Sequence, residues 1–341
     1  MLRIAVPSKG ELEEPTLAFL RACGLSVNRP NSRQYMAEIP GLDRSVVVFQ
    51  RAADIPAKVE EGSVDLGITG LDIVNEGLRE GSQVGVLMED LDYGGCELVV
   101  AVPDTWIDVA SMADLVEVAE EMRSRGQELR VATKYPRMAR DFLLRKELNY
   151  FTLVSASGAI EASPTLGFAD VIADLTSSGT TLRENGLKTL VDGTILSSQS
   201  CLIGNLTSLR NNPEALESTR HLLEMIEAYL RARDFFSVSA NVRGDSEDMV
   251  AQKALSYPET AGISGPTVAP VHNRYGEERD WFNVTVIVTK KNLMRATERL
   301  RGIGANSIIV FPVHYVFHEE SSAFVRLEQT LQSTPSLSGR A

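Results

Sequence analysis

The sequence predicts an α/β protein of two lobes, followed by a small α+β domain. Three observations support this fold class. Short apolar runs alternate with helical patterns through residue 187, which is typical of layered, largely parallel sheets. After residue 236 the pattern changes to β-α-β-β-α-β spacing. The chain of 341 residues is also longer than one ordinary domain.

The elements of the first lobe follow from the spacing of apolar residues. Runs of four to eight apolar residues indicate strands, and apolar residues three or four apart indicate helices. "CELVVAVP" is apolar throughout, as expected for a strand buried on both faces. We expect strands at 2–7, 45–50, 64–70 and 96–103, and helices at 11–25 and 52–62.

The same patterns continue to the C-terminal part of the chain. The second lobe has expected helices at 109–126 and 135–148, strands at 129–134, 150–157 and 169–175, and a helix from Leu182. A long helix at 213–235 leads to a ferredoxin-like unit. Its expected strands lie at 235–242, 281–288 and 306–317, and its helices at 246–255 and 291–304. The predicted division is 1–97 with 188–236, 98–187, 237–330, and a frayed tail at 331–341.

Composition narrows the function classes. A net charge of −12 argues against general nucleic-acid binding, because neutralising phosphates requires clustered Lys and Arg. No apolar run is long enough to cross a membrane, and the N-terminus does not read as a signal peptide. Three widely spaced cysteines form neither a zinc pattern nor a disulfide framework, so we expect a reducing cytoplasm.

The segment "ADLTSSGTTLRENG" carries the clearest chemical signal. A strand is expected to end near Asp174, and a loop rich in hydroxyls and glycine leads into the next helix. Free N–H groups at a helix start and hydroxyl donors suit a phosphomonoester. A carboxylate beside them suits ribose hydroxyls. Phosphorylated ribose therefore fits the loop, although an ordinary helix cap with solvated Ser and Thr remains the alternative.

Six ordered blocks resemble ATP phosphoribosyltransferase, the first enzyme of histidine biosynthesis. "DLTSSGTTLRENGL" is similar to that family's phosphoribosyl-pyrophosphate loop. The other blocks are "LRIAVPSKGELEEPTLAFLRACGL", "DIPAKVEEGSVDLGITGLDIV" with "ELVVAVP", "RVATKYPRMARDFL", "SGAIEASPTLGFADVIADL", and "ISGPTVAP" with "VIVTKKNLMRATERLRGIGANSIIVFPV". Together they cover nearly the whole chain.

The resemblance implies a magnesium-dependent transfer of phosphoribosyl from phosphoribosyl pyrophosphate to N1 of ATP. It also implies a core like type II periplasmic binding proteins, and an ACT-like domain that binds histidine as feedback inhibitor. Long forms of the family are hexamers built from dimers, so we expect a homo-oligomer. Asp174 would then hold the ribose hydroxyls. The loop residues Thr176, Ser177, Ser178, Gly179, Thr180 and Thr181 would hold the 5′-phosphate.

Further roles follow from the resemblance. Glu161 is assigned to ribose or Mg²⁺ contacts and Asp170 to structure, and no direct metal ligands are expected beyond Glu161 and Asp174. Cationic candidates for the phosphates are Lys9, Arg33 and Arg51, each with a solvated surface charge as its alternative, and Lys134, which could instead complement a nearby acid. The regulatory histidine is expected near Ile263, Ser264, Thr267, Gly304, Ala305 and Ser307, which could also be plain turns.

One position departs from the family pattern. The first loop commonly reads Lys-Gly-Arg, and this chain has Glu11 in the third place. That anion leaves a second interpretation open, a catalytically silent paralogue acting as a regulatory subunit. A two-lobed binding module is the third, since fold does not fix function.

Overall fold

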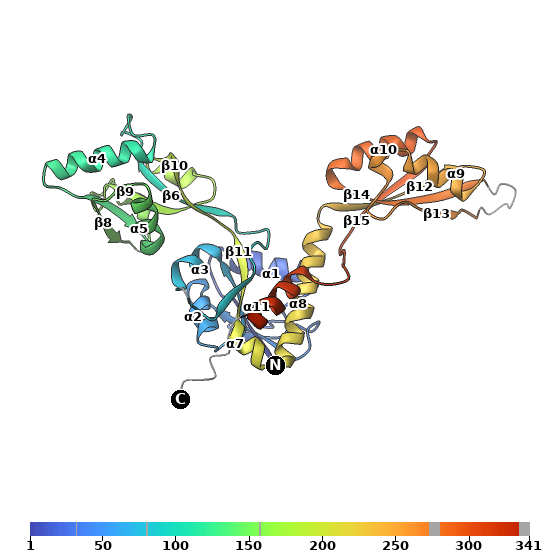
Figure 1. Ribbon diagram of the computed structural model, residues 1–341, viewed down its shortest axis with the longest axis horizontal. Helices are drawn as coiled ribbons and strands as arrows, with labels where there is room; N and C mark the ends of the chain where they lie inside the picture. The colour runs from blue at the N-terminus through green and yellow to red at the C-terminus, as the bar shows by residue number, and fades with distance from the viewer. Residues whose placement is uncertain (32, 80, 157, 273–279, 334–341) are drawn as a thin grey trace. The chain divides into compact units, whose positions relative to one another are not determined.

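A computed structural model describes the chain except for residues 32, 80, 157, 273–279 and 334–341 (Figure 1). It divides into two units. One is Met1–Leu222 together with the chain from Ser322, and the other is Leu223–Ser321. Among the described residues, none of the helices combines the length and apolar character required to cross a membrane.

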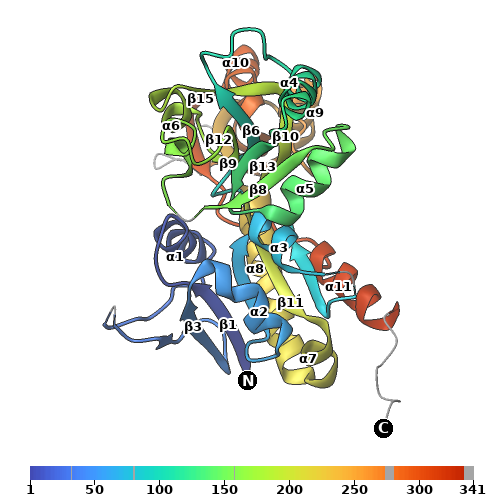
Figure 2. The same cartoon turned by 90° about the vertical axis from the view of Figure 1, so that its left-hand side faces the viewer.

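The first lobe is built on a six-stranded sheet in the order β2-β3-β1-β4-β11-β5. Its strands are β1 (Leu2–Pro7), β2 (Met36–Ala37), β3 (Ser45–Gln50), β4 (Leu66–Gly70), β5 (Val84–Met88) and β11 (Ser200–Asn205). β1 pairs in parallel with β3 and β4, whereas β11 runs antiparallel to β4 and β5. The helices are α1 (Glu13–Ala22), α2 (Ile55–Glu60), α3 (Leu71–Gly77), α7 (Leu206–Asn211) and the beginning of α8 (Pro213–Ala232), which continues into the second unit from Leu223. α2 lies across the sheet face, as Figure 2 shows.

The second lobe is a five-stranded sheet in the order β10-β6-β9-β7-β8. Its strands are β6 (Cys96–Pro103), β7 (Leu129–Thr133), β8 (Phe151–Ser155), β9 (Val171–Thr176) and β10 (Leu187–Ser198). α4 (Met112–Ser124), α5 (Pro136–Arg145) and α6 (Thr180–Glu184) complete the lobe. Ser111 and Asp114 form a reciprocal capping box that fixes where α4 begins. The five consecutive residues Leu98–Val102 of β6 are all buried, as its apolar run predicts.

The chain crosses between these two sheets twice. β5 belongs to the first sheet and β6 to the second, and β10 belongs to the second and β11 to the first. The second crossing is short, because only Gln199 separates β10 from β11. Such paired crossings place the connections at the junction of the lobes, where the cavity described below also lies.

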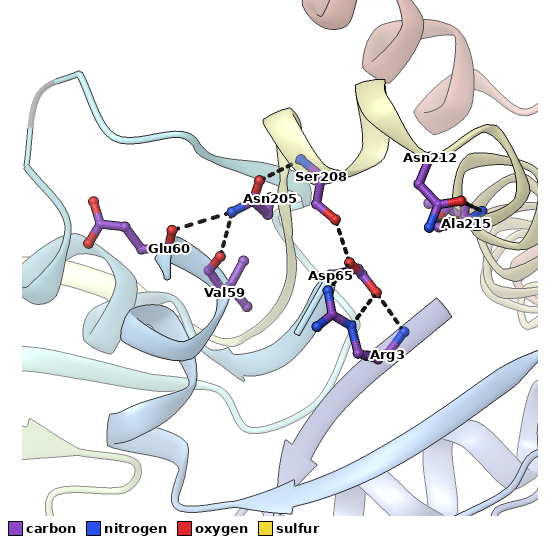
Figure 3. Close-up of polar contacts among 9 residues, drawn as sticks. Arg3, Val59, Glu60, Asp65, Asn205, Ser208, Asn212 and Ala215 are labelled. Atoms are coloured by element: carbon purple, nitrogen blue, oxygen red, sulfur yellow. Dashed lines mark hydrogen bonds and ion pairs between the residues drawn. The ribbon is translucent and has the colours of Figure 1, made fainter. Parts of the chain in front are cut away.

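Each lobe is held by the same arrangement of one arginine and one aspartate. In the first, the backbone N–H of Arg3 donates to Asp65 at 2.8 Å, and its guanidinium binds the same carboxylate at 2.7 and 3.1 Å (Figure 3). Ser208 at the start of α7 donates to Asp65 as well. In the second lobe, Arg130 contacts Asp170 in the same three ways, at 2.8, 3.1 and 2.8 Å. Asp170 is therefore structural, as expected.

The second unit contains a four-stranded antiparallel sheet in the order β13-β14-β12-β15. Its elements are β12 (Phe235–Arg243), α9 (Glu247–Leu255), β13 (Thr267–Pro270), β14 (Trp281–Thr289), α10 (Leu293–Gly302) and β15 (Asn306–Pro312). α9 and α10 cover one face of the sheet (Figure 1) and bury Val238, Ala240, Val284 and Val286 against Val250 and Leu300. This is the ferredoxin-like fold that the spacing predicted.

Several elements differ from the sequence expectations. Residues 187–205 form β10 and β11, although no element was assigned to 194–205. The helix expected from Leu182 begins at Thr180, and the strand expected at 306–317 ends at Pro312. α11 (Ser322–Ser333) was not predicted. It buries Ala323, Leu327 and Leu331 and belongs to the first unit, whereas the sequence division extended the regulatory domain to residue 330. The expected frayed tail lies largely outside the described residues, and the bounds of the two lobes stay a prediction.

Candidate active site

A cavity of about 580 Å³ is lined by residues of both sheets of the first unit. From the first lobe it takes the loop after β1, the end of β4 and the segment before β6. From the second it takes the end of β9, the loop after it, and Glu161. These are places where strands end and loops begin, which is where open α/β sheets bind ligands. Of the predicted substrate residues, the lining includes Lys9, Glu161, Asp174, Thr176, Ser177, Ser178, Thr180 and Thr181.

Asp174 and Glu161 form the acidic part of this cavity. Asp174 lies near the end of β9, with Leu175 opposite Leu98 of the neighbouring strand. Burial raises the pKa of the Asp174 carboxyl, the backbone N–H of Leu175 and the charge of Lys134 lower it, and the charge of Glu161 raises it. The net effect is a raised pKa. The charge of Glu161 therefore acts on Asp174, and a cation or a set of hydroxyl donors would stabilise the ionised form of Asp174.

The loop from Thr176 to Thr181 is a tight turn with its hydroxyls toward solvent. Gly179 begins α6 at φ +70°, a left-handed conformation that suits glycine. The Gly179 N–H donates to the Thr176 hydroxyl at 2.9 Å, and the Ser178 hydroxyl donates to Thr180 at 3.0 Å. Buried Leu182 fixes the short helix behind the loop. The loop therefore combines a stable backbone with exposed donors at Ser177, Ser178, Thr180 and Thr181.

The remaining cations lie outside the lining of this cavity. Arg51 is exposed immediately before Ala52, which does line it. Arg33 is exposed between α1 and β2, and its backbone N–H donates to Asn31. Lys134 is exposed beside Tyr135 and acts on Asp174 through its charge. The structure therefore brings Lys9 alone of the four predicted cations into the described wall of the cavity.

Asp72 and Tyr135 are residues of the cavity wall that sequence reasoning missed. Asp72 follows the end of β4 by two residues and is 4% exposed, and Tyr135 follows the end of β7 by two residues. The Tyr135 hydroxyl donates to Asp72 at 2.7 Å. Burial and then the charge of Asp72 raise the pKa of Tyr135, so the phenol stays protonated. The signal that could have found both is their position just beyond the carboxyl ends of parallel strands. Glu11, singled out as a departure, also lines the cavity.

The second unit has a cavity of its own, of about 1130 Å³. Ile263, Ser264 and Thr267 line it together with Thr285, Ile287 and the segment 315–320. Gly304 and Ala305 lie just before β15 and Ser307 lies near its start, and none of the three belongs to the described lining of this cavity. The six predicted effector residues therefore fall into two groups within this unit.

Comparison with known proteins decides the family. The family model "HisG: ATP phosphoribosyltransferase" matches residues 51–228, and "HisG, C-terminal domain" matches residues 232–315. The chain belongs to the ATP phosphoribosyltransferase family. An ATP phosphoribosyltransferase of Bradyrhizobium sp. (strain ORS 278) is 35% identical, over 97% of this chain and 99% of that protein. ATP phosphoribosyltransferase 2, chloroplastic, of Arabidopsis thaliana is 37% identical, over 97% of this chain and 80% of that protein.

A solved structure is also similar to this chain. It is an ATP phosphoribosyl transferase (HisG:HisZ) complex from Thermotoga maritima, 26% identical, with a TM-score of 0.49. The match covers 67% of this chain and 98% of that chain. Both family models end before α11, so this helix lies beyond the matched domains.

Proposed function

We propose that this chain transfers the phosphoribosyl group of phosphoribosyl pyrophosphate to N1 of ATP, the first step of histidine biosynthesis. Adenine N1 attacks C1 of the ribose, the bond between C1 and the pyrophosphate oxygen breaks, and pyrophosphate leaves. One observation supports the location of the active site: Asp174, Glu161 and residues of the 176–181 loop line one cavity in a chain of this family. The nucleophile belongs to the substrate, so the site needs no catalytic triad.

The roles of the second lobe follow from its donors and acceptors. Asp174 accepts hydrogen bonds from the ribose hydroxyls, because a carboxylate offers acceptors only. The exposed hydroxyls of Ser177, Ser178, Thr180 and Thr181 and the loop N–H groups hold the 5′-phosphate. Gly179 keeps the backbone in the turn that presents them. This arrangement fixes the sugar by its two ends and leaves C1 facing the other lobe.

The first lobe meets the phosphates of the leaving group and of ATP. Lys9 is exposed in its loop and supplies the cation that lines the cavity. Arg51 is adjacent to the lining residue Ala52, and Arg33 is exposed between α1 and β2. Lys134, of the second lobe, acts on Asp174 through its charge. Arginine grips phosphate by two parallel hydrogen bonds, so Arg51 and Arg33 would bind parts of ATP that extend past the cavity.

Magnesium fits the residues that are present. Among described residues, no three of His, Cys, Asp and Glu gather into a metal-binding group. Mg²⁺ is commonly held by one or two carboxylates together with substrate phosphates. Glu161 and Asp174 offer that pair, and a cation would offset the charge of Glu161 that raises the pKa of Asp174. When bound with phosphoribosyl pyrophosphate, Mg²⁺ would neutralise charge on the leaving group.

Regulation by histidine is part of the proposal. The hydroxyls of Ser264 and Thr267 line the cavity of the second unit and suit the carboxylate of an amino acid. Gly304, Ala305 and Ser307 lie outside its described lining, and we keep them as a second group that would be completed by another copy of the chain in a homo-oligomer. We place the enzyme in the cytoplasm, since its proposed reaction needs ATP.

Pyrophosphate release tests the reaction directly. Purified protein with ATP, phosphoribosyl pyrophosphate and Mg²⁺ should release pyrophosphate only when both substrates are present, and histidine should reduce the rate. Asp174→Ala and Thr181→Ala should each reduce turnover with little effect on unfolding. Wild-type rates in both variants would remove the loop from the mechanism.

Glu11 supports a second candidate function, that of a catalytically silent regulatory subunit. Its carboxylate lines the cavity on the side of Lys9 and opposes the binding of anions there. A silent subunit would bind histidine and release no pyrophosphate with intact substrates. Recovery of turnover by Glu11→Arg would then identify the cause.

A further inference from the structure

The helix α5 of the second lobe is capped by a residue of the first lobe. Tyr135 stands at its N-cap position and makes no side-chain capping bond, and Pro136 has no N–H to donate. The next two N–H groups, of Arg137 and Met138, donate to the two carboxylate oxygens of Glu76 at 2.9 and 3.0 Å. The Arg137 side chain also donates to the Glu76 carbonyl at 3.2 Å. The first turn of α5 therefore depends on α3 for its hydrogen bonds.

One turn earlier on α3, Asp72 makes a second connection of this kind. The Tyr135 hydroxyl donates to one of its oxygens at 2.7 Å, and the Ser198 hydroxyl donates to the other at 2.9 Å. The Asp72 N–H donates to the same Ser198 hydroxyl at 2.9 Å. Ser198 ends β10, where the chain passes back to the first sheet. Asp72 thus ties the first lobe both to the second lobe and to the crossing strand.

The packing around Asp72 leaves little freedom for this arrangement. Asp72 is 4% exposed and Ser198 is 2% exposed, so the carboxylate is held among fixed partners rather than water. A Cβ on Gly70 would lie 2.4 Å from the Asp72 carboxylate oxygen. Glycine at this position is therefore required for Asp72 to reach Tyr135 and Ser198.

The residues that make these contacts lie only partly in the wall of the cavity. Asp72, Tyr135 and Gly70 line it, whereas Glu76 is outside its described lining. The cavity exists only when the Lys9 loop of the first lobe and the 174–181 loop of the second face each other. A contact that fixes α5 against α3 fixes the lobes that carry these two loops.

We propose that the cross-lobe clasp, defined as Asp72 and Glu76 with Tyr135, Arg137, Met138 and Ser198, sets the separation of the two lobes and so positions the two halves of the active site. Glu76 is its positioning residue at α5, and Asp72 is its positioning residue at the crossing strand. The structural inference stands on the hydrogen bonds, and its kinetic consequence rests on the proposed function.

The test compares Glu76→Gln and Tyr135→Phe with matched controls elsewhere on the same lobes. The two N–H groups donate to different oxygens of Glu76, and glutamine replaces one of these oxygens with an NH₂ group that cannot accept. Glu60→Gln and Tyr150→Phe are the controls, since both residues are exposed and outside the clasp. Steady-state kinetics for ATP and phosphoribosyl pyrophosphate are measured on the full chain.

The separation of the lobes is measured independently of activity. Spin labels at Ala18→Cys on α1 and Glu120→Cys on α4 report the distance between the lobes, since both positions are exposed. The labels are placed in a Cys96→Ser background, because Cys96 is the one half-buried cysteine and Cys23 and Cys201 are buried. The distance distribution is compared with and without Glu76→Gln.

We expect Glu76→Gln to broaden the distance distribution and to raise both KM values about three- to tenfold, the value of one or two hydrogen bonds. kcat should stay within about twofold, because the enzyme–substrate complex and the transition state lose the same stabilisation. An unchanged distribution with unchanged KM values would overturn the clasp, even if the melting temperature fell. Absence of activity in the native chain would overturn the proposed function, and the distances would still decide the clasp.

Discussion

Asp174 combines a function that needs its charge with surroundings that oppose that charge. Burial raises the pKa of its carboxyl, and the charge of Glu161 adds to the effect. The folded state therefore binds the proton more tightly than the unfolded state does. Stability must fall as pH rises from the unfolded pKa through the raised folded pKa, and the loss is complete above it.

Asp174→Asn should therefore separate function from stability. We expect kcat/KM to fall about a hundredfold or more, as when a group acting on the transition state is removed. The free energy of unfolding at neutral pH should increase, and the gain should disappear below the unfolded pKa. Urea unfolding at several pH values measures this. A variant that is less stable than the native chain at neutral pH would contradict the assignment.

Glu11 makes the cavity more acidic than two anionic substrates would favour. The described lining of the cavity contains four carboxylates and one ammonium group. The carboxylates are those of Glu11, Asp72, Glu161 and Asp174, and the ammonium is that of Lys9. Asp72 accepts hydrogen bonds from Tyr135 and Ser198, and Asp174 and Glu161 have proposed roles in substrate and Mg²⁺ binding. Glu11 is the one of the four carboxylates to which we assign no role.

Glu11→Gln should lower KM for phosphoribosyl pyrophosphate about two- to fivefold, since a charge near the surface contributes about 1 kcal/mol or less. It should also lower the Mg²⁺ concentration that gives half the maximal rate. Glu14→Gln, an exposed residue on α1, is the control. A higher KM in Glu11→Gln would instead make Glu11 a substrate or metal contact.

At the scale of elements, the repeated arginine–aspartate pair supports both lobes unequally. The Asp65 side chain is 1% exposed, and that of Asp170 is 18% exposed. Burial opposes ionisation of Asp65, but hydrogen bonds from Arg3 and Ser208 outweigh it and lower its pKa. Its contribution to stability is therefore present above the unfolded pKa and is lost as pH falls through the lowered folded value.

Asp65→Asn should consequently reduce the free energy of unfolding by about 2 kcal/mol, near the cost of a lost charged hydrogen-bond pair. Asp170→Asn should cost about half as much, since its pair is more exposed. Chemical denaturation at neutral pH provides the comparison. The difference between Asp65→Asn and the native chain should shrink at acidic pH, and a constant difference would contradict the linkage.

Elements with a single dominant pattern could be predicted from the sequence, and those defined by distant pairing could not. β6 was predicted at its observed bounds, because its continuous apolar run has one interpretation. β13 has four residues and is defined by pairing with β14, so its sequence carries little signal. α11 carries apolar residues at helical spacing, at Ala323, Leu327 and Leu331, but it follows an irregular segment and stands next to the chain end, so the sequence division assigns it to the end of the regulatory domain.

The site divides in the same way at the scale of the whole molecule. Asp174 and the 176–181 loop are contiguous, so one segment revealed them. The clasp joins residues that are far apart in the sequence: Tyr135 and Asp72 are 63 residues apart. Asp72 and Glu76 contact α5 and Tyr135 only when the two lobes face each other. Neither residue spacing nor composition encodes that pairing, and this is why the cross-lobe clasp required the structure.

The assignment of α11 changes how regulation should be tested. Deleting residues 237–341 would remove α11, which buries Leu327 in the first unit, and any loss of activity would then be ambiguous. Two point variants of the full chain avoid this. Ser264→Tyr places a bulky ring at the lining of the cavity of the second unit, and Leu327→Ala weakens the packing of α11.

Ser264→Tyr should abolish inhibition by histidine and leave the uninhibited rate unchanged, because its cavity is separate from the active-site lining. Leu327→Ala should lower the free energy of unfolding by about 2–4 kcal/mol, as for a buried leucine, and retain inhibition. Rates with increasing histidine and unfolding curves for both variants give the two readouts. Full inhibition in Ser264→Tyr would place the effector outside this cavity, and the second group at Gly304, Ala305 and Ser307 would become the site to test.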